Sequence, residues 1–234
     1  MKDLDIAKFG GTSVGNFQAM TSSYKVTVSN KNTRLVIISA CSGVTNILVE
    51  LASGACNKEK IDALIAKLRE IHYEIIAGLG GDQKLKDHIE EHLSEIRKLA
   101  QEASMGRSDE LTDRMVSHGE LMSSYLFTAL FNFYGTKAVW FDIRRVMRTD
   151  SAFGCAVPLV EVIGALCKEQ LIPLLEEDAI IISQGFIASN TEGQTTTLGR
   201  GGSDYSAALL GEACNASSIS IWTDVPGVYT TDPR

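Results

Sequence analysis

A glycine-rich segment late in the chain, Thr195–Ala208 (TTTLGRGGSDYSAA), carries residue types that suit the binding of anions. Its threonines favour a strand, the glycines break that strand, and an apolar helix pattern follows. Adjacent glycines let the backbone approach a ligand closely, and free N–H groups at a helix start bind anions. Arg200 adds a guanidinium fork for a carboxylate or phosphate. Ser203 or Asp204 can cap this helix. The alternative is a plain glycine-rich turn between strand and helix with solvated charges.

Two other loops with similar chemistry follow predicted strands. Leu4–Phe9 predicts a strand that runs into KFGGTS, where a lysine, two glycines and hydroxyls suit a phosphate. This loop lacks the Lys-Ser/Thr pair of a Walker A motif, and a simple strand-to-helix turn is the alternative. Arg34–Ala40 predicts a strand buried on both faces, and it opens into CSGVTN. Ligands bind at the carboxyl ends of such strands, so Ser39 and Thr45 are ligand candidates, although Thr45 equally fits a helix cap.

One acidic residue lies at the edge of a predicted helix, Asp109–Phe133. At about 100° per residue, Glu120 falls beside the apolar stripe of this helix. Gly119 precedes it and would let another backbone or a ligand come close. The pattern leaves open whether Glu120 points into a site or is an ordinary boundary residue.

The rest of the chain alternates strands and helices. Two amphipathic patterns, 59–79 and 84–103, are separated by glycines and predict a helical hairpin over residues 59–103. Further predicted elements are strands at 137–143, 179–188 and 218–222 and a short helix at 160–168. Since neither a linker nor a repeat interrupts this order, we expect an α/β fold. It would be a three-layer αβα sandwich with a mainly parallel central sheet.

Two groups of basic side chains are not predicted to be functional sites. His88 and His92 lie one turn apart in HIEEH, but Ile89 stands where a metalloprotease motif has glutamate. We therefore expect a solvated helix face there, not a metal site. An arginine cluster after residue 143 (RRVMR) suits the surface or an interface better than catalysis.

Composition narrows the classes of function. The 234 residues carry a net charge of −7, which argues against nucleic acid or an anionic membrane as the main partner. Five cysteines without a CxxC motif indicate reduced thiols, not a disulfide framework or a zinc site. Neither a signal-peptide pattern nor an apolar run long enough for a bilayer is present. We expect a cytoplasmic protein.

Seven motifs, in order and over nearly the whole chain, resemble the catalytic domain of the aspartokinases, within the amino acid kinase family. The resemblance is greatest to the monofunctional, lysine-sensitive kind. The motifs are KFGGTSV, SACSGVTN, SHGELMS, WFDIRRVMRT, SQGFIAS, TTTLGRGGSDYSAALL and WTDVPGVYTTDPR. The resemblance implies transfer of the ATP γ-phosphoryl group to the β-carboxylate of L-aspartate, the first step toward lysine, threonine and methionine. It also implies Mg²⁺ bound mainly through the ATP phosphates, and a homodimer.

Residue roles are implied where this chain matches the family motifs. Lys8 resembles the lysine that neutralises the transferring phosphoryl group, and Asp204 resembles the acid that holds this lysine. The implied ATP contacts are Lys8, Phe9, Gly10, Gly11, Thr12, Thr223, Asp224, Tyr229 and Arg234. The implied aspartate contacts are Ser39, Thr45, Glu120, Arg200, Gly201, Gly202 and Ser203. No side chain is expected to bind a metal.

Physical chemistry agrees with these roles. A carboxylate is already a nucleophile at neutral pH, so phosphoryl transfer to it depends on positioning and charge neutralisation. An amino acid substrate needs a cation for its α-carboxylate and an anion for its α-ammonium, and Arg200 and Glu120 are such a pair.

The length of the chain does not decide whether it is catalytically active. Relatives continue past Arg234 with more of the kinase lobe and with ACT regulatory domains. We therefore expect residues 1–234 to be a kinase catalytic domain, truncated at its C-terminus and without ACT domains. The alternatives are another amino acid kinase of the glutamate type, or a fragment that binds nucleotide or aspartate without turning over.

Overall fold

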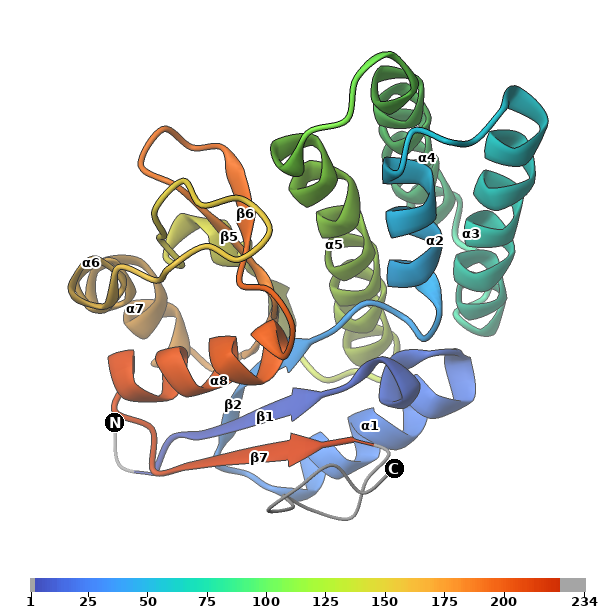
Figure 1. Ribbon diagram of the computed structural model, residues 1–234. Coiled ribbons are helices and arrows are strands. Elements are labelled where there is room, and N and C mark those ends of the chain that lie inside the picture. The colour runs from blue at the N-terminus through green and yellow to red at the C-terminus, as the bar shows by residue number, and fades with distance from the viewer. Residues whose placement is uncertain (1–2, 224–234) are drawn as a thin grey trace, which may run out of the picture.

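A five-stranded parallel sheet forms the centre of the computed structural model, which describes residues 3–223 (Figure 1). The strand order is β3-β4-β2-β1-β7, so the first strand lies inside the sheet between the second and the last. The strands are β1 (Asp5–Phe9), β2 (Thr33–Ile38), β3 (Ala138–Trp140), β4 (Ile180–Gln184) and β7 (Ser218–Trp222). A separate antiparallel pair consists of β5 (Ile187–Ser189) and β6 (Thr195–Thr197).

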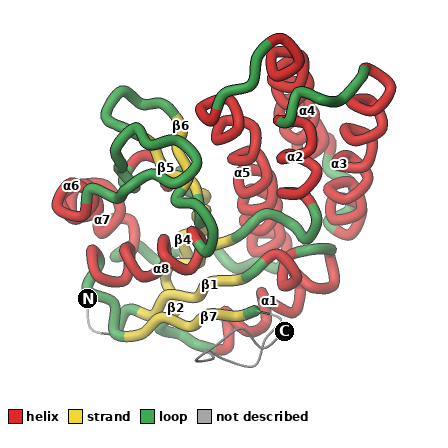
Figure 2. The backbone as a smooth tube through the Cα atoms, viewed as in Figure 1, coloured by secondary structure: helices red, strands yellow, loops and turns green. Residues whose placement is uncertain are grey.

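The apolar run of β2 supplies two hydrophobic cores because successive side chains point to opposite faces of a sheet. Val36 and Ile38 join the core beneath α1 to α5, whereas Leu35 and Ile37 join the core beneath α6 to α8. All four side chains are fully buried, as expected of a parallel strand covered on both faces. Figure 2 shows the strands between these helices, and the predicted three-layer sandwich with a mainly parallel sheet is confirmed.

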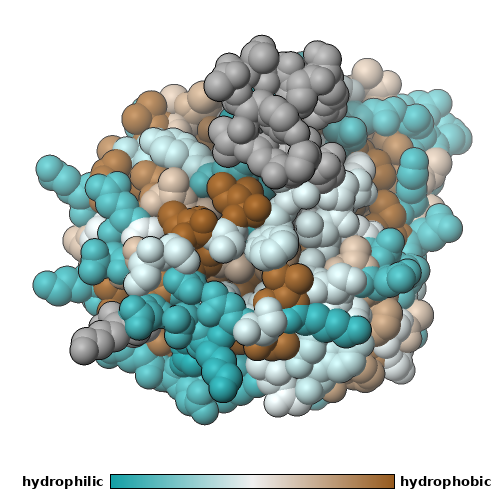
Figure 3. All heavy atoms as spheres, turned by 90° about the horizontal axis from the view of Figure 1, so that it is seen from below, coloured by the Kyte–Doolittle hydropathy of each residue, from teal (hydrophilic) through white to brown (hydrophobic). Residues whose placement is uncertain are grey.

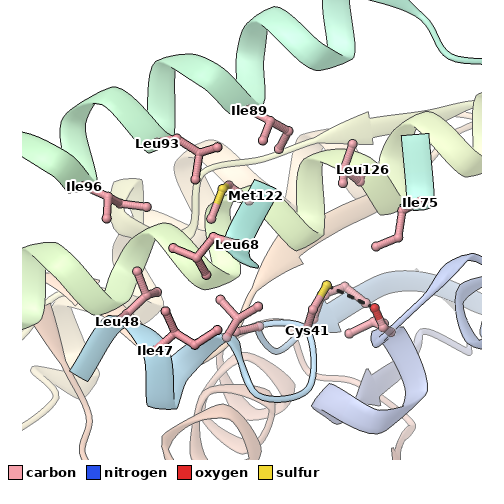
Figure 4. Close-up of a cluster of buried hydrophobic side chains, with 14 of the residues drawn as sticks. Cys41, Ile47, Leu48, Leu68, Ile75, Ile89, Leu93, Ile96, Met122 and Leu126 are labelled. Atoms are coloured by element: carbon pink, nitrogen blue, oxygen red, sulfur yellow. Dashed lines mark hydrogen bonds between the residues drawn. The ribbon is translucent and has the colours of Figure 1, made fainter. Parts of the chain in front are cut away.

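Amphipathic helices cover the first face. They are α1 (Phe17–Ser29), α2 (Val44–Ala52), α3 (Lys58–Gly78), α4 (Gln83–Met105) and α5 (Asp109–Phe133). Helix α5 contacts β2, β3 and β4, and α2 and α4 pack on α5. Apolar side chains of four helices meet between them, among them Leu48, Leu68, Leu93 and Met122 (Figure 4). The predicted helix 109–133 has the same bounds in the structure, where Ser108 caps it through the Leu111 N–H.

The second face is covered by α6 (Val160–Leu166), a π-helical turn (Cys167–Leu171), α7 (Ile172–Leu175) and α8 (Gly202–Ala213). This helical segment is longer than predicted. The predicted strand 179–188 is also divided in two, because Phe186 adopts a φ of 69° and the chain leaves the sheet. Gly185 allows this departure, since a Cβ there would lie 2.7 Å from the Ser203 Cβ.

Strand β7 is an edge of the parallel sheet within the described residues. It exposes three large apolar side chains, Ile219, Ile221 and Trp222. Figure 3 shows apolar and hydrophilic residues side by side on the face seen from below, the side on which β7 lies in Figure 1. Of the helices in residues 3–223, none combines the length and the apolar character needed to cross a membrane.

Candidate active site

The carboxyl ends of β1 and β2 and the start of α8 surround a cavity of about 380 Å³. This is the edge where open α/β sheets bind ligands. The predicted site residues that line the cavity are Lys8, Gly11, Ser39, Thr45, Glu120, Arg200, Gly201, Gly202, Ser203 and Asp204. The fold thus brings together residues from strand β1, from the loops after β1 and β2, from the glycine-rich loop, and from helices α2, α5 and α8.

Lys8 reaches this cavity because it shares the face of β1 with Ile6, the side that α8 covers. Its Nζ lies 2.6 Å from Oδ1 of Asp204 in the first turn of α8. The lysine is buried, whereas the Asp204 side chain is half exposed. This ion pair satisfies a buried ammonium, which would be costly if left unpaired.

Asp204 is therefore an ion-pair partner and not a helix cap. The expectation that it or Ser203 caps α8 is wrong: the N-cap is Gly201, with a φ of 77° and no side-chain cap. Gly199 also has a positive φ, of 73°. These conformations favour glycine because they crowd a Cβ, so the glycines fix the path of the loop.

Glu120 is buried in the cavity wall and is only 3% exposed, so the alternative of an ordinary boundary residue is wrong. Its Oε1 accepts a hydrogen bond from the Ala40 N–H at 3.2 Å. Its Oε2 is buried without a hydrogen-bond partner among the described residues. Burial raises the pKa of Glu120 to about 8, although the Ala40 hydrogen bond and the Lys8 charge act in the opposite direction.

Gly119 brings helix α5 close to the loop that follows β2. A Cβ at this position would lie 2.8 Å from the Ala40 Cβ, nearer than side chains normally pack. The expectation that Gly119 admits a close approach is confirmed. The same approach places Glu120 within reach of the Ala40 N–H.

Arg200 stands exposed on the glycine-rich loop and pairs with no carboxylate among the described residues. Strand β6, which leads into this loop, is tied to helix α5: Asp113 accepts hydrogen bonds from the Thr197 N–H and hydroxyl at 2.9 and 2.7 Å. Among the described residues, the cavity lining combines two cations, Lys8 and Arg200, with two acids, Glu120 and Asp204.

Other predicted nucleotide contacts lie beside the cavity. Phe9 is buried and stacks on Trp222, so its ring belongs to the core. Gly10 donates its N–H to the Trp222 carbonyl and lies beside Lys8 and Thr223. Thr12 is exposed and does not line the cavity. The remaining predicted contacts, Asp224, Tyr229 and Arg234, fall outside the described residues.

Several lining residues were not predicted. They are Ala40, Cys41, Ser42, Gly43, Asn46, Phe186 and Gly199. Most of them belong to loops that were identified from the sequence, namely the loop after β2 and the glycine-rich loop. The CSGVTN sequence after β2 includes Ser42 and Asn46, although neither was chosen as a ligand candidate. Phe186 lies in the SQGFIAS motif but was not singled out as a site residue, and it has an unusual backbone conformation, with a φ of 69°. Thr45 is the second residue of α2, whose N-cap is Gly43, so Thr45 does not cap this helix.

The histidines of α4 differ from the prediction of a solvated face. The His92 and His118 Nδ1 atoms are 2.7 Å apart, and the His88 ring stacks on Tyr125 at 3.7 Å. Burial lowers the pKa of His92 to about 3 and that of His118 to about 4. In residues 3–223, no group of three or more His, Cys, Asp or Glu side chains could hold a metal ion.

Comparison with known families accounts for this arrangement. Residues 4–234 match the model of the amino acid kinase family. The chain belongs to this family. The amino acid kinase domain described here therefore has its cavity, with Lys8 and Glu120, at the carboxyl edge of the sheet.

Two curated proteins with similar sequences are aspartokinases. The chain is 48% identical over 234 residues to lysine-sensitive aspartokinase 3 of Escherichia coli K12, covering all of this chain and 52% of the relative. It is 36% identical over 231 residues to aspartokinase of Chlamydia trachomatis, covering 98% of this chain and 50% of the relative. The chain thus spans about half the length of the curated relatives that it matches.

A solved structure is also similar to this amino acid kinase domain. It is E. coli aspartokinase III in complex with aspartate and ADP. The TM-score is 0.95 at 47% identity, and the match covers 99% of this chain and 51% of the other.

Proposed function

We propose that this amino acid kinase domain, residues 1–234, catalyses transfer of the ATP γ-phosphoryl group to the β-carboxylate of L-aspartate. The observation that carries this proposal is the buried Oε2 of Glu120, which has no hydrogen-bond partner among the described residues and lies in the same cavity as Arg200 and Lys8. The similarity to E. coli aspartokinase III, whose crystal structure contains aspartate and ADP, supports it. The product would be 4-phospho-L-aspartate, which leads toward lysine, threonine and methionine. We further propose a cytoplasmic homodimer.

Substrate recognition follows from the charges in the cavity. Glu120 would accept the α-ammonium group, because its buried Oε2 has no other partner among the described residues. Arg200 would bind the α-carboxylate, with Ser39, Thr45, Gly201, Gly202 and Ser203 as neighbouring contacts. A substrate without the ammonium would leave a buried carboxyl unpaired, which a polar site rejects strongly.

The transfer itself needs no strong base, since the aspartate β-carboxylate is ionised at neutral pH. A carboxylate oxygen forms a bond to the γ-phosphorus while the bond from this phosphorus to the bridging oxygen breaks. The electron pair of the broken bond leaves with ADP. The Lys8 ammonium, held by Asp204, would neutralise charge on the transferring group.

Nucleotide contacts are proposed on both sides of Lys8. Phe9, Gly10, Gly11, Thr12 and Thr223 would contribute from the described residues, and Asp224, Tyr229 and Arg234 lie outside them. Mg²⁺ held by ATP phosphate oxygens would add further charge neutralisation.

The test is an assay of ADP release with Mg-ATP, in which hydroxylamine traps the acyl phosphate. We expect hydroxamate with L-aspartate and at most a few per cent of that rate with L-glutamate, whose extra methylene misplaces the reacting carboxylate. Faster turnover of glutamate would support the other kind of amino acid kinase. Binding of aspartate and ATP without product, from folded protein, would support an incomplete site.

A further inference from the structure

A second cavity, of about 360 Å³, is lined by three arginines. Arg144, Arg145 and Arg148 come from the 3-10 turn after β3 and the residues that follow it. Ser189 and Thr195, from the β5–β6 pair, also line the cavity. The residues that line it are all different from those that line the candidate active site.

The charges around this cavity do not balance. Among the described residues, Asp142 is the single acid in the lining, and its carboxylate accepts hydrogen bonds from Nε and Nη2 of Arg144 at 2.6 to 3.2 Å. Three positive charges and one negative charge therefore leave two positive charges, in a protein whose net charge is −7. Among the described residues, neither Arg145 nor Arg148 pairs with a carboxylate.

Neutral partners hold two of these arginines in place. Arg148 Nη1 donates to Ser189 Oγ at 2.6 Å and to the Asn190 carbonyl at 3.1 Å. Arg145 lies over the Phe141 ring, 5.0 Å from its centroid, and donates to the Gln170 side chain. These contacts fix the guanidinium groups without cancelling their charge, and they leave N–H donors unused.

Arg144 is also held by the β5–β6 pair. Its Nη1 donates to Thr195 Oγ1 at 3.1 Å, in addition to the contacts with Asp142. The Ser189 hydroxyl donates to the Arg144 carbonyl at 2.7 Å, so the β5–β6 pair holds the arginine turn from two positions. The cluster is therefore positioned before any ligand arrives, which lowers the entropic cost of binding.

We propose that this cavity is a binding site for a small oxyanion, with phosphate or carboxylate groups. Guanidinium groups present parallel N–H donors that match the paired oxygens of both groups. Ligand pockets have volumes of roughly 300–1,000 Å³, and this cavity falls within that range. The proposed kinase reaction uses none of its residues, so this site is additional to it.

The test titrates inorganic phosphate and citrate into ¹⁵N-labelled protein and follows the backbone amides by NMR. We expect the largest shifts at the amides of Gly193 and Thr195. Because the first cavity also contains cations, the titration is repeated with Arg200→Gln, which should keep these shifts. A response to phosphate alone assigns the phosphate class, and a response to citrate alone assigns the carboxylate class.

Substitutions then locate the site. Arg148→Gln should weaken binding of the responding anion by about tenfold or more. Exposed Arg145 gives a second variant, Arg145→Gln, in case the first disturbs folding. The matched control is Arg107→Gln, because Arg107 is exposed and lies outside both cavities. Absence of shifts with both anions, or equal affinity in the Arg145→Gln and Arg107→Gln variants, would overturn the proposal.

Discussion

The ammonium of Lys8 lies 2.6 Å from the carboxylate of Asp204, although β1 and α8 are near opposite ends of the described chain. The parallel sheet makes this contact because β1 runs through its interior and α8 covers the adjoining face. The buried ammonium of Lys8, near the carboxyl end of β1, is thereby held in one position. The proposed transfer of the phosphoryl group depends on this position of Lys8.

Asp204→Asn should lower the free energy of unfolding by about 1–2 kcal/mol. Loss of one partner of a fully buried pair costs about 3–5 kcal/mol, but the Asp204 side chain is half exposed. Urea denaturation measures the difference. The matched control is Glu212→Gln, an exposed acid on the same helix. Equal stability of the two variants would contradict a structural role for the pair.

Glu120 should make the stability of the ligand-free protein depend on pH. Burial raises its pKa from an ordinary 4.5 to about 8, so the folded state binds one more proton than the unfolded state between these values. Its contribution to the free energy of unfolding is therefore fully present below about pH 4.5 and is lost as the pH rises toward about 8. Glu120→Gln removes this dependence.

Urea denaturation at about pH 5 and about pH 8 measures the effect. Wild type should lose stability relative to Glu120→Gln between these two values. A constant difference between the two proteins would show that Glu120 has the same pKa in the folded and unfolded states.

Aspartate binding should release a proton from Glu120. An α-ammonium group beside the carboxyl favours its charged form, so a group with a pKa of about 8 loses its proton near neutral pH. Calorimetry in two buffers of different ionisation enthalpy measures this release. Binding enthalpies that are equal in both buffers would show that Glu120 does not meet the ammonium.

Gly119→Ala should destabilise the protein by about 1–3 kcal/mol, because the new methyl group would overlap the Ala40 Cβ. It should also weaken aspartate binding by moving Glu120. The control is Gly164→Ala in α6, where a Cβ meets nothing within 4 Å. This control should be stabilising by about 0.5–1 kcal/mol, since alanine favours a helix. Similar changes in both variants would contradict the close packing of α5.

Much of the fold could be predicted from hydrophobic periodicity. The apolar stripe of helix 109–133 and the apolar run of β2 consist of side chains that the fold buries. Both elements occur where the sequence predicted them. The segment 179–188 was predicted as one strand running into Gly185. The strand ends at Gln184 and the chain turns at Phe186, a backbone feature that the hydrophobic pattern does not report. The helix after residue 160 was predicted to end at Lys168, but the helical segment continues through a π-helical turn to Leu175.

The site could be predicted only in part. Loops at strand ends indicated Lys8 and Arg200, but the periodicity of α5 could not decide whether Glu120 faces water or a cavity. That depends on the contact between Gly119 and Ala40, residues far apart in the sequence. The arginine cavity could not be predicted either, because the β5–β6 pair closes it from a distant segment.

The most direct test of the account compares acyl phosphate formation by wild type, Lys8→Ala and Lys67→Ala, with Mg-ATP and L-aspartate. Lys67 is an exposed lysine on α3 that does not line the cavity, and it serves as the control. We predict that Lys8→Ala lowers the rate by about a hundredfold or more while aspartate binding and folding persist, and that Lys67→Ala has wild-type activity. Equal rates for Lys8→Ala and Lys67→Ala would contradict the assignment of the cavity as the site of phosphoryl transfer.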